Sequence, residues 1–222
     1  VNSSFFGIPR HIGSPFEAVV LLGLDMIHRL VLTFGIFSKF ENTLLDTDFI
    51  QKIYKHSLQT ATISKCIAKY EGLENKIVED IFLAGMLHDI GKLILSENFP
   101  EFYIKVAKFS KEKGICIYEA ESMIFGTTHA EVGAYLLGLW GLPDSIVEAV
   151  AFHHNLALCH HGKAVIPKII HAGNIFEKSL TSSAEIQEKI DTDYFDKSGI
   201  IDRLAIWEDI GRKIITGENN VG

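Results

Sequence analysis

The pair His88-Asp89 directly follows an apolar run, residues 81–87. Imidazole and carboxylate groups both bind divalent metals such as Mn²⁺, Fe²⁺, Zn²⁺ or Mg²⁺. The apolar run predicts a buried helix, so the two polar groups would stand at its inner end. Buried polar groups need partners, and a metal ion can supply them. The pair therefore indicates a metal site, with capping of the helix end as the alternative interpretation.

Other histidines fall at the ends or on the faces of further predicted helices. His56 lies within a long helix that begins at Asp46 or Asp48 and ends near Gly72. His129 opens a helix predicted over 128–139. The pair at 153–154 closes a helix that begins at 143–144, where proline is typical of a first turn. Each of these positions could place an imidazole at a helix end or on an inward face.

The remaining periodic segments are also helical, so we predict an all-α fold, a multi-helix bundle. Residues 14–17 read Ser-Pro-Phe-Glu, which is typical of a helix start with a capping box. No convincing alternation typical of strands occurs. Besides those already named, the predicted helices cover residues 14–22, 25–40, 74 or 75 to about 91, 100–114, 118–125, 164–180, 184–190 and 201–215. A soft link is expected at one of two polar stretches, 181–183 or 191–198.

Composition excludes several functional classes. The chain has 222 residues, is 47% hydrophobic and 22% charged, and carries a net charge of −7, so it can bury a sizeable core and is not disordered. It contains no cluster of five or more Lys and Arg residues, which disfavours direct binding to a nucleic-acid backbone. Asp25, His28 and Arg29 interrupt the apolar stretch 16–40, so we expect core helices without membrane insertion and a cytoplasmic protein.

The three cysteines are widely spaced and form no CxxC motif. We interpret Cys66 and Cys116 as small core residues in a reducing compartment. Cys159 lies near the histidine pairs at 153–154 and 160–161, where a zinc site is conceivable, although a solvent-facing loop is the favoured interpretation. We assign no role to His11 and His28, and we expect His171 to be a helix residue near the cleft.

The order His, His-Asp, His, His-His resembles that of the HD superfamily of metal-dependent phosphohydrolases. Several further motifs around these residues resemble those of its HDOD branch. The similarity runs from residue 1 to about 180, so we predict an HDOD-like domain over 1–180. A C-terminal helical extension, 181–222, would pack on the same domain. The chain opens with Val1, partway through the family pattern, and is expected to be a fragment. The matching stretches are 2–7, 12–15, 17–18, 22–23, 84–92, 129–134 and 140–143.

The resemblance implies a site. In the superfamily, the first His, the His-Asp pair and a later Asp hold a metal that activates water for attack on a phosphate ester. In this chain, the residues that correspond to the first His and to the His-Asp pair are His56, His88 and Asp89. The resemblance implies catalytic roles for Asp89 and for Lys92, whose ammonium group would bind a phosphate or carboxylate. The alternative for Lys92 is a solvated cation at a helix end. The extra histidines of enzymes with two or more metals correspond to His129, His153 and His154.

Two departures weaken the enzyme interpretation. Asn174 stands where the later Asp is expected, and its neutral amide is a weaker ligand that cannot act as a general base. The Gly-Tyr-Pro of the related HD-GYP phosphodiesterases is missing after His154. We therefore predict a non-catalytic bacterial signalling output or scaffold domain that may hold a divalent metal or none. Its partners would be signalling proteins or a fused sensor or receiver domain, and a nucleotide is the candidate ligand. A phosphohydrolase acting on a nucleotide or phosphodiester, and a purely structural adaptor, are the alternatives.

Overall fold

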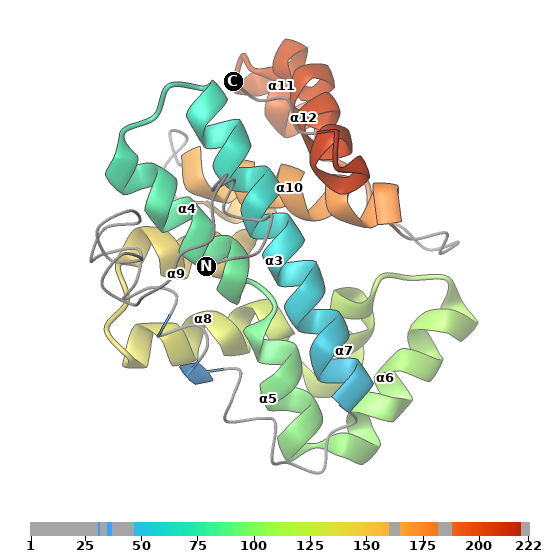
Figure 1. The fold of residues 1–222 in the computed structure, drawn as a ribbon. Helices are drawn as coiled ribbons and strands as arrows, with labels where there is room; N and C mark the ends of the chain where they lie inside the picture. The colour runs from blue at the N-terminus through green and yellow to red at the C-terminus, as the bar shows by residue number, and fades with distance from the viewer. Residues whose placement is uncertain (1–30, 32–34, 37–46, 160–164, 182–187, 219–222) are drawn as a thin grey trace.

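The computed structural model describes residues 31, 35–36, 47–159, 165–181 and 188–218. The helices predicted over 14–22 and 25–40, like His11 and His28, fall outside these ranges, apart from residues 31, 35 and 36. Within them the regular structure is entirely helical, as predicted (Figure 1). The longer helices are α3 (Thr47–Tyr70), α4 (Asn75–Leu87), α5 (Ile90–Asn98), α6 (Pro100–Lys113), α7 (Ile117–Phe125), α8 (His129–Leu139), α9 (Asp144–Phe152), α10 (Val165–Thr181), α11 (Thr192–Lys197) and α12 (Leu204–Thr216). None of the described helices is both long and apolar enough to cross a membrane.

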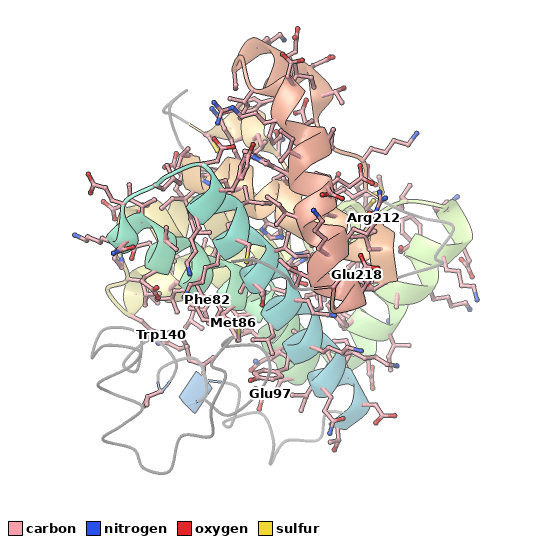
Figure 2. The ribbon with its side chains drawn as sticks, turned by 45° about the horizontal axis from the view of Figure 1, so that its top comes forward. Phe82, Met86, Glu97, Trp140, Arg212 and Glu218 are labelled. Atoms are coloured by element: carbon pink, nitrogen blue, oxygen red, sulfur yellow. The ribbon has the colours of Figure 1, made fainter. Side chains whose placement is uncertain are left out.

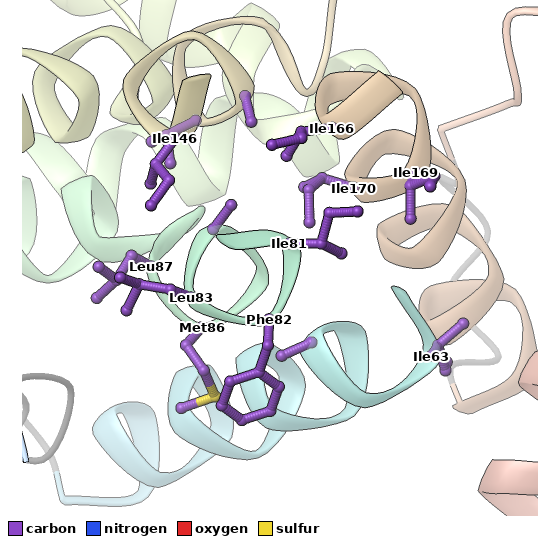
Figure 3. Packing of buried hydrophobic residues seen from close by; sticks show 14 of the residues in the cluster. Ile63, Ile81, Phe82, Leu83, Met86, Leu87, Ile146, Ile166, Ile169 and Ile170 are labelled. Atoms are coloured by element: carbon purple, nitrogen blue, oxygen red, sulfur yellow. The ribbon is translucent and has the colours of Figure 1, made fainter. Parts of the chain in front are cut away.

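Helix α4 forms the centre of the core. Its side chains Ile81, Phe82, Met86 and Leu87 are almost completely buried, as expected from the apolar run. Figure 3 shows Phe82 and Met86 directed toward α3, Ile81 toward α10, and Leu87 away from α3. Because apolar side chains leave α4 on several sides, its C-terminal end must lie inside the protein. The polar pair that follows α4 is therefore buried as well.

Glycines allow the helices to approach closely around this pair. A Cβ atom on Gly85 of α4 would lie 2.6 Å from the Cα atom of Ala61 on α3. A Cβ atom on Gly173 of α10 would lie 2.3 Å from Ser64 Oγ, also on α3. The Cα atom of Ala61 cannot move without shifting α3, so the contact at position 85 requires glycine, whereas a side chain at position 173 would force the Ser64 hydroxyl to rotate. The close approach brings the residues of α3, α4 and α10 that face the polar pair within reach of one another.

The helix predicted to end or bend near Gly91 instead ends at Leu87, and a separate helix, α5, begins at Ile90. A Cβ atom on Gly91 would stand only 1.9 Å from the His129 carbonyl oxygen, because the start of α5 packs against the start of α8. Gly91 therefore permits a close helix contact rather than ending a helix. The break leaves His88 and Asp89 in a buried turn between two helices.

The C-terminal region also differs from expectation. The polar stretch 191–198, one of the two expected places for a soft link, contains α11, whose start is capped by the Asp191 side chain accepting from the Tyr194 backbone N–H at 3.0 Å. Phe195 is completely buried, and with Trp207 of α12 it joins the main hydrophobic cluster. Of the helix predicted over 184–190, residues 184–187 lie outside the described ranges and 188–190 are not helical.

Many charged side chains lie on the outside of this arrangement, although several, including Asp89, Glu121 and Glu177, are buried. Figure 2 shows Arg212 and Glu218 on the outer side of the C-terminal helix region, whereas Phe82 and Met86 lie among the helices. Cys66 and Cys116, expected in the core, are half-buried. The division of the chain at residue 180 stays a prediction.

Candidate metal centre

The six His and Asp residues singled out in the sequence lie together, although they come from four regions of the chain. His56 lies on α3, His88 and Asp89 in the turn between α4 and α5, and His129 is the first residue of α8. His153 and His154 directly follow α9. Buried helix ends thus supply five of these residues, and the face of α3 supplies the sixth.

These side chains form two groups that could hold metal ions, and both include Asp89. The first group is His56, His88 and Asp89; the second is Asp89, His129, His153 and His154. Within each group the donor atoms lie within 4.8 Å of one another. Each carboxylate oxygen of Asp89 serves one group, so this residue lies between two candidate ions.

The distances follow that division. Asp89 Oδ2 lies 3.5 Å from His56 Nε2 and 3.6 Å from His88 Nε2. Asp89 Oδ1 lies 3.2 Å from His129 Nε2 and 3.8 Å from His153 Nε2. Donor atoms around a single ion at about 2.0–2.2 Å stand roughly 3–3.5 Å from one another. The spacing therefore approximates that of ligands around an ion.

In five histidines the ring nitrogen remote from Asp89 contacts an outer acceptor. His88 Nδ1 lies 2.8 Å from the Gly85 carbonyl oxygen, and His153 Nδ1 lies 2.8 Å from that of Val150. Carboxylates face the other three rings, and the pairs are His56–Glu177, His129–Glu121 at 2.6 Å and His154–Glu188 at 2.8 Å. An acceptor at Nδ1 makes that nitrogen the donor, so the Nε2 lone pair of a neutral ring is directed inward.

The inward lone pairs face one another at short range. His56 Nε2 lies 3.2 Å from His88 Nε2, and His154 Nε2 lies 3.0 Å from His129 Nε2. Two neutral acceptors at this distance repel each other unless a cation or proton lies between them. In addition, His153 Nε2 is buried without a hydrogen-bond partner among the described residues. This donor set, with its orphaned nitrogen, fits a divalent metal.

The pKa values of the buried groups favour metal binding. Burial lowers the pKa of His88 to about 3 and holds the pKa of His153 and His154 well below the ordinary histidine value. Burial would raise the pKa of Asp89, but His88 and Lys92 outweigh it and hold that pKa well below the usual range. The ligands are thus neutral imidazoles around an ionised carboxylate, the forms that metals bind.

His129 is the exception among these histidines. Burial opposes its charge, yet the carboxylates of Glu121 and Asp89 raise its pKa above the ordinary value. His129 therefore holds a proton more tightly than an ordinary histidine does, and a metal ion competes with that proton for the ring nitrogen.

The structure also places the two remaining predicted site residues. Lys92 Nζ donates to Asp89 Oδ2 at 2.6 Å, so its ammonium group is paired rather than simply solvated. Asn174 is completely buried on α10, and neither atom of its amide has a hydrogen-bond partner among the described residues. One turn earlier, His171 Nδ1 donates to the His153 carbonyl oxygen, and one turn later Glu177 contacts His56. Helical spacing therefore puts Asn174 on the face toward the cluster, and its role as a ligand stays a prediction.

Sequence reasoning missed the three carboxylates Glu121, Glu177 and Glu188. Acidic residues are common on helix surfaces, so nothing in their spacing marks them, although Glu177 follows Asn174 by one helical turn. Their contacts with histidines depend on packing between different elements, which are 8 to 121 residues apart in the sequence. Cys159 belongs to neither ligand group, and burial raises the pKa of its thiol to about 11. Its suggested neighbours His160 and His161 lie outside the described residues.

A cavity of about 730 Å³ opens beside His56 and Asp89. Four lysines line it, although the chain carries a net charge of −7. Aromatic and apolar side chains, including Phe49 and Tyr103, complete the wall. The four lysines are Lys52, Lys55, Lys92 and Lys178. A cavity of this composition is suited to an anionic ligand that also carries an apolar or aromatic part.

Comparisons with known proteins agree with this arrangement. The sequence model of the HDOD domain family matches residues 1–156. An uncharacterized protein of Treponema pallidum is 28% identical over 156 residues, 70% of this chain and 30% of that protein. Ribonuclease Y of Opitutus terrae is 24% identical over 158 residues, 70% of this chain and 23% of the enzyme. The chain thus spans less than a third of the length of these relatives.

A solved structure extends the similarity to the C-terminal region. The crystal structure of an HDOD domain protein of unknown function from Geobacter sulfurreducens has a TM-score of 0.76 and 26% sequence identity. The alignment covers 97% of this chain and 74% of that protein. The likeness therefore includes the helices that follow the segment matched by the family.

Proposed function

Because this chain belongs to the HDOD domain family, we propose that it is a signal-transduction domain whose central cleft holds divalent metal. One observation carries the proposal. The histidine Nε2 atoms converge on the two oxygens of Asp89, while outer carboxylates and carbonyls engage the opposite ring nitrogens. Metal-ligating histidines have such outer partners, which fix the ring and its tautomer.

The two groups would divide the ligands between two ions. His56, His88 and Asp89 would hold one, and His129, His153 and His154 would hold the other with the second oxygen of Asp89. A bound divalent metal supplies Lewis acidity and lowers the pKa of a water molecule. The outer carboxylates keep the imidazoles in orientation, and α4 with α5 holds Asp89 between the groups.

We favour a signalling role without hydrolysis for two reasons. Asn174 offers a neutral amide where the HD phosphohydrolases that the chain resembles carry a carboxylate. Asp89 Oδ2 already accepts a hydrogen bond from Lys92, which reduces the negative charge available to an ion in the first group. Both features should weaken metal binding, and the amide removes a candidate general base.

A phosphohydrolase acting on a nucleotide or phosphodiester is the second candidate. The lysine-lined cavity beside Asp89 favours it, because phosphate groups attract ammonium groups and the aromatic wall could contact a base. The similarity to ribonuclease Y over 158 residues also supports it. The same cavity would serve a signalling domain as a nucleotide sensor, so turnover is what distinguishes the two functions.

Metal analysis of the purified chain tests the proposal. We expect bound transition metal by elemental analysis, and metal binding by calorimetric titration that is lost in Asp89→Ala and weakened in His153→Ala. Asp209→Ala, which removes an exposed carboxylate on α12, is the matched control and should bind as wild type does. Circular dichroism would show that each variant is folded. A folded wild-type chain that binds none of Mn²⁺, Fe²⁺ or Zn²⁺ would refute the proposal.

Turnover decides between the two candidates. We expect no hydrolysis of phosphodiester substrates by the wild-type chain with Mn²⁺ or Mg²⁺. Robust hydrolysis that disappears in Asp89→Ala would instead establish the phosphohydrolase. Signalling partners, a fused sensor or receiver domain, a cytoplasmic location and a domain boundary at residue 180 are further parts of the proposal, supported by the family resemblance.

A further inference from the structure

We propose that the segment after α10, residues 188–216, positions the second ligand group, so that docking of this segment sets the metal affinity of His129, His153 and His154. This inference rests on the proposed metal binding. It goes beyond it by assigning a role to a part of the chain that follows the segment matched by the family, residues 1–156.

The first contact is made by Glu188. Both of its carboxylate oxygens lie 2.8 Å from His154 Nδ1, and the side chain is only 7% exposed. The ring of Tyr118 stacks on the imidazole, with centroids 4.3 Å apart and planes 15° apart. Tyr118 restricts the plane of the ring, and Glu188 selects between its two flipped orientations by accepting from Nδ1. Together they direct Nε2 of His154 toward His129.

The second contact reaches the neighbouring histidine through its backbone. The backbone N–H of Asp191 donates to His171 Nε2 at 3.3 Å, and His171 Nδ1 donates to the His153 carbonyl oxygen at 2.7 Å. That carbonyl belongs to the peptide bond joining His153 to His154. The segment therefore contacts one ligand ring directly and fixes the peptide between two ligands through a single intermediate residue.

Buried aromatic residues hold the segment in place. Phe195 is completely buried and stacks against His171, with ring centroids 6.2 Å apart. Trp207 packs against Phe195 at 6.0 Å and donates its indole N–H to Glu71 Oε1 at 2.8 Å. Glu71 lies just after α3, so the segment contacts the C-terminal end of α3 as well as α10. Docking of α11 and α12 and placement of Glu188 are thus linked.

Among the described residues, no side chain of this segment contacts a ligand of the first group directly. His56 is held by Glu177 of α10, and His88 by the Gly85 carbonyl oxygen of α4. Both partners precede residue 181. Loss of the segment's contacts should therefore affect one ligand group and leave the other intact, which a general loss of stability would not do.

Substitution of Glu188 in the full chain provides the test. Calorimetric titration with Mn²⁺ should show that Glu188→Ala weakens the second group by about 10–100-fold, the usual cost of losing an outer partner of a metal-bound histidine. Glu188→Gln keeps an oxygen that accepts from His154 Nδ1, and should bind closer to wild type than Glu188→Ala. Glu208→Ala, an exposed position on α12, is the control and should change nothing.

Two backgrounds separate the ligand groups. In His56→Ala only the second group is complete, and Glu188→Ala added there should reduce binding by the same 10–100-fold. In His153→Ala only the first group is complete, and the added Glu188→Ala should have no effect. Trp207→Ala, which loosens docking without touching a ligand, should reproduce the selective loss.

The outcomes distinguish this inference from the proposed function. If wild type binds no metal, both fall. If wild type binds metal and Glu188→Ala binds it equally well, only the positioning role is refuted. Equal weakening of the two groups by Glu188→Ala would also refute it, because the effect would then be a general loss of structure.

Discussion

Gly91→Ala should disrupt the second ligand group without altering any ligand. The added Cβ atom would lie 1.9 Å from the His129 carbonyl oxygen, whereas an ordinary carbon–oxygen contact is about 3.3 Å or longer. The starts of α5 and α8 would have to separate by about 1.4 Å. The Cβ position is fixed by the backbone of residue 91 and the oxygen belongs to the backbone of residue 129, so no side-chain rotation can relieve the contact. We expect a loss of about 1–3 kcal/mol in the free energy of unfolding.

The same displacement would move His129 away from Asp89. Displacements of about 1 Å at a functional site can cost on the order of 100-fold, so we expect metal affinity of the second group to fall by about 10–100-fold. Calorimetric titration and denaturant unfolding would measure the two effects. Gly138→Ala is the matched control, because a Cβ atom there meets nothing within 4 Å and should stabilise α8 by up to about 1 kcal/mol. Wild-type affinity and stability in Gly91→Ala would refute the reasoning.

Three further predictions concern the core, the amide and pH. Leu87→Ala removes a completely buried side chain and should cost about 2–5 kcal/mol in denaturant unfolding; a loss below about 1 kcal/mol would contradict its central place. Asn174→Asp should lower the metal dissociation constant measured by calorimetry, since an anionic ligand replaces a neutral one; an unchanged constant would place residue 174 outside the site. Burial lowers the pKa of His88 from 6.5 to about 3, so between these values the unfolded chain binds the proton more tightly. Thermal unfolding of the metal-free protein should therefore show stability falling as pH drops from about 6.5 toward 3, and rising stability would contradict this.

Local sequence information predicts the helices well where one strong pattern dominates. The apolar run before His88 indicated a buried helix, and that helix is the centre of the core. The pattern could not show that α4 ends at Leu87, because a glycine at position 91 is compatible with both a helix end and a close contact. Only the position of His129, on another helix, decides between them. The prediction of a soft link at 191–198 was wrong for a similar reason. Phe195 is buried by contacts with α10 and α12, which the local sequence does not show.

The types and order of the His and Asp residues predicted one cleft with metal-binding chemistry through the family that they resemble. The pair alone left capping of the helix end open as an alternative. The sequence alone also determined the all-α class, because the 3.6-residue apolar period is a local property of the chain. Tertiary structure decided how the ligands are divided around Asp89 and which nitrogen of each ring faces inward. Glu121, Glu177 and Glu188 control that orientation from 8 to 121 residues away in the sequence. Such contacts depend on helix packing, which brings remote residues together and leaves no periodic signal in the chain.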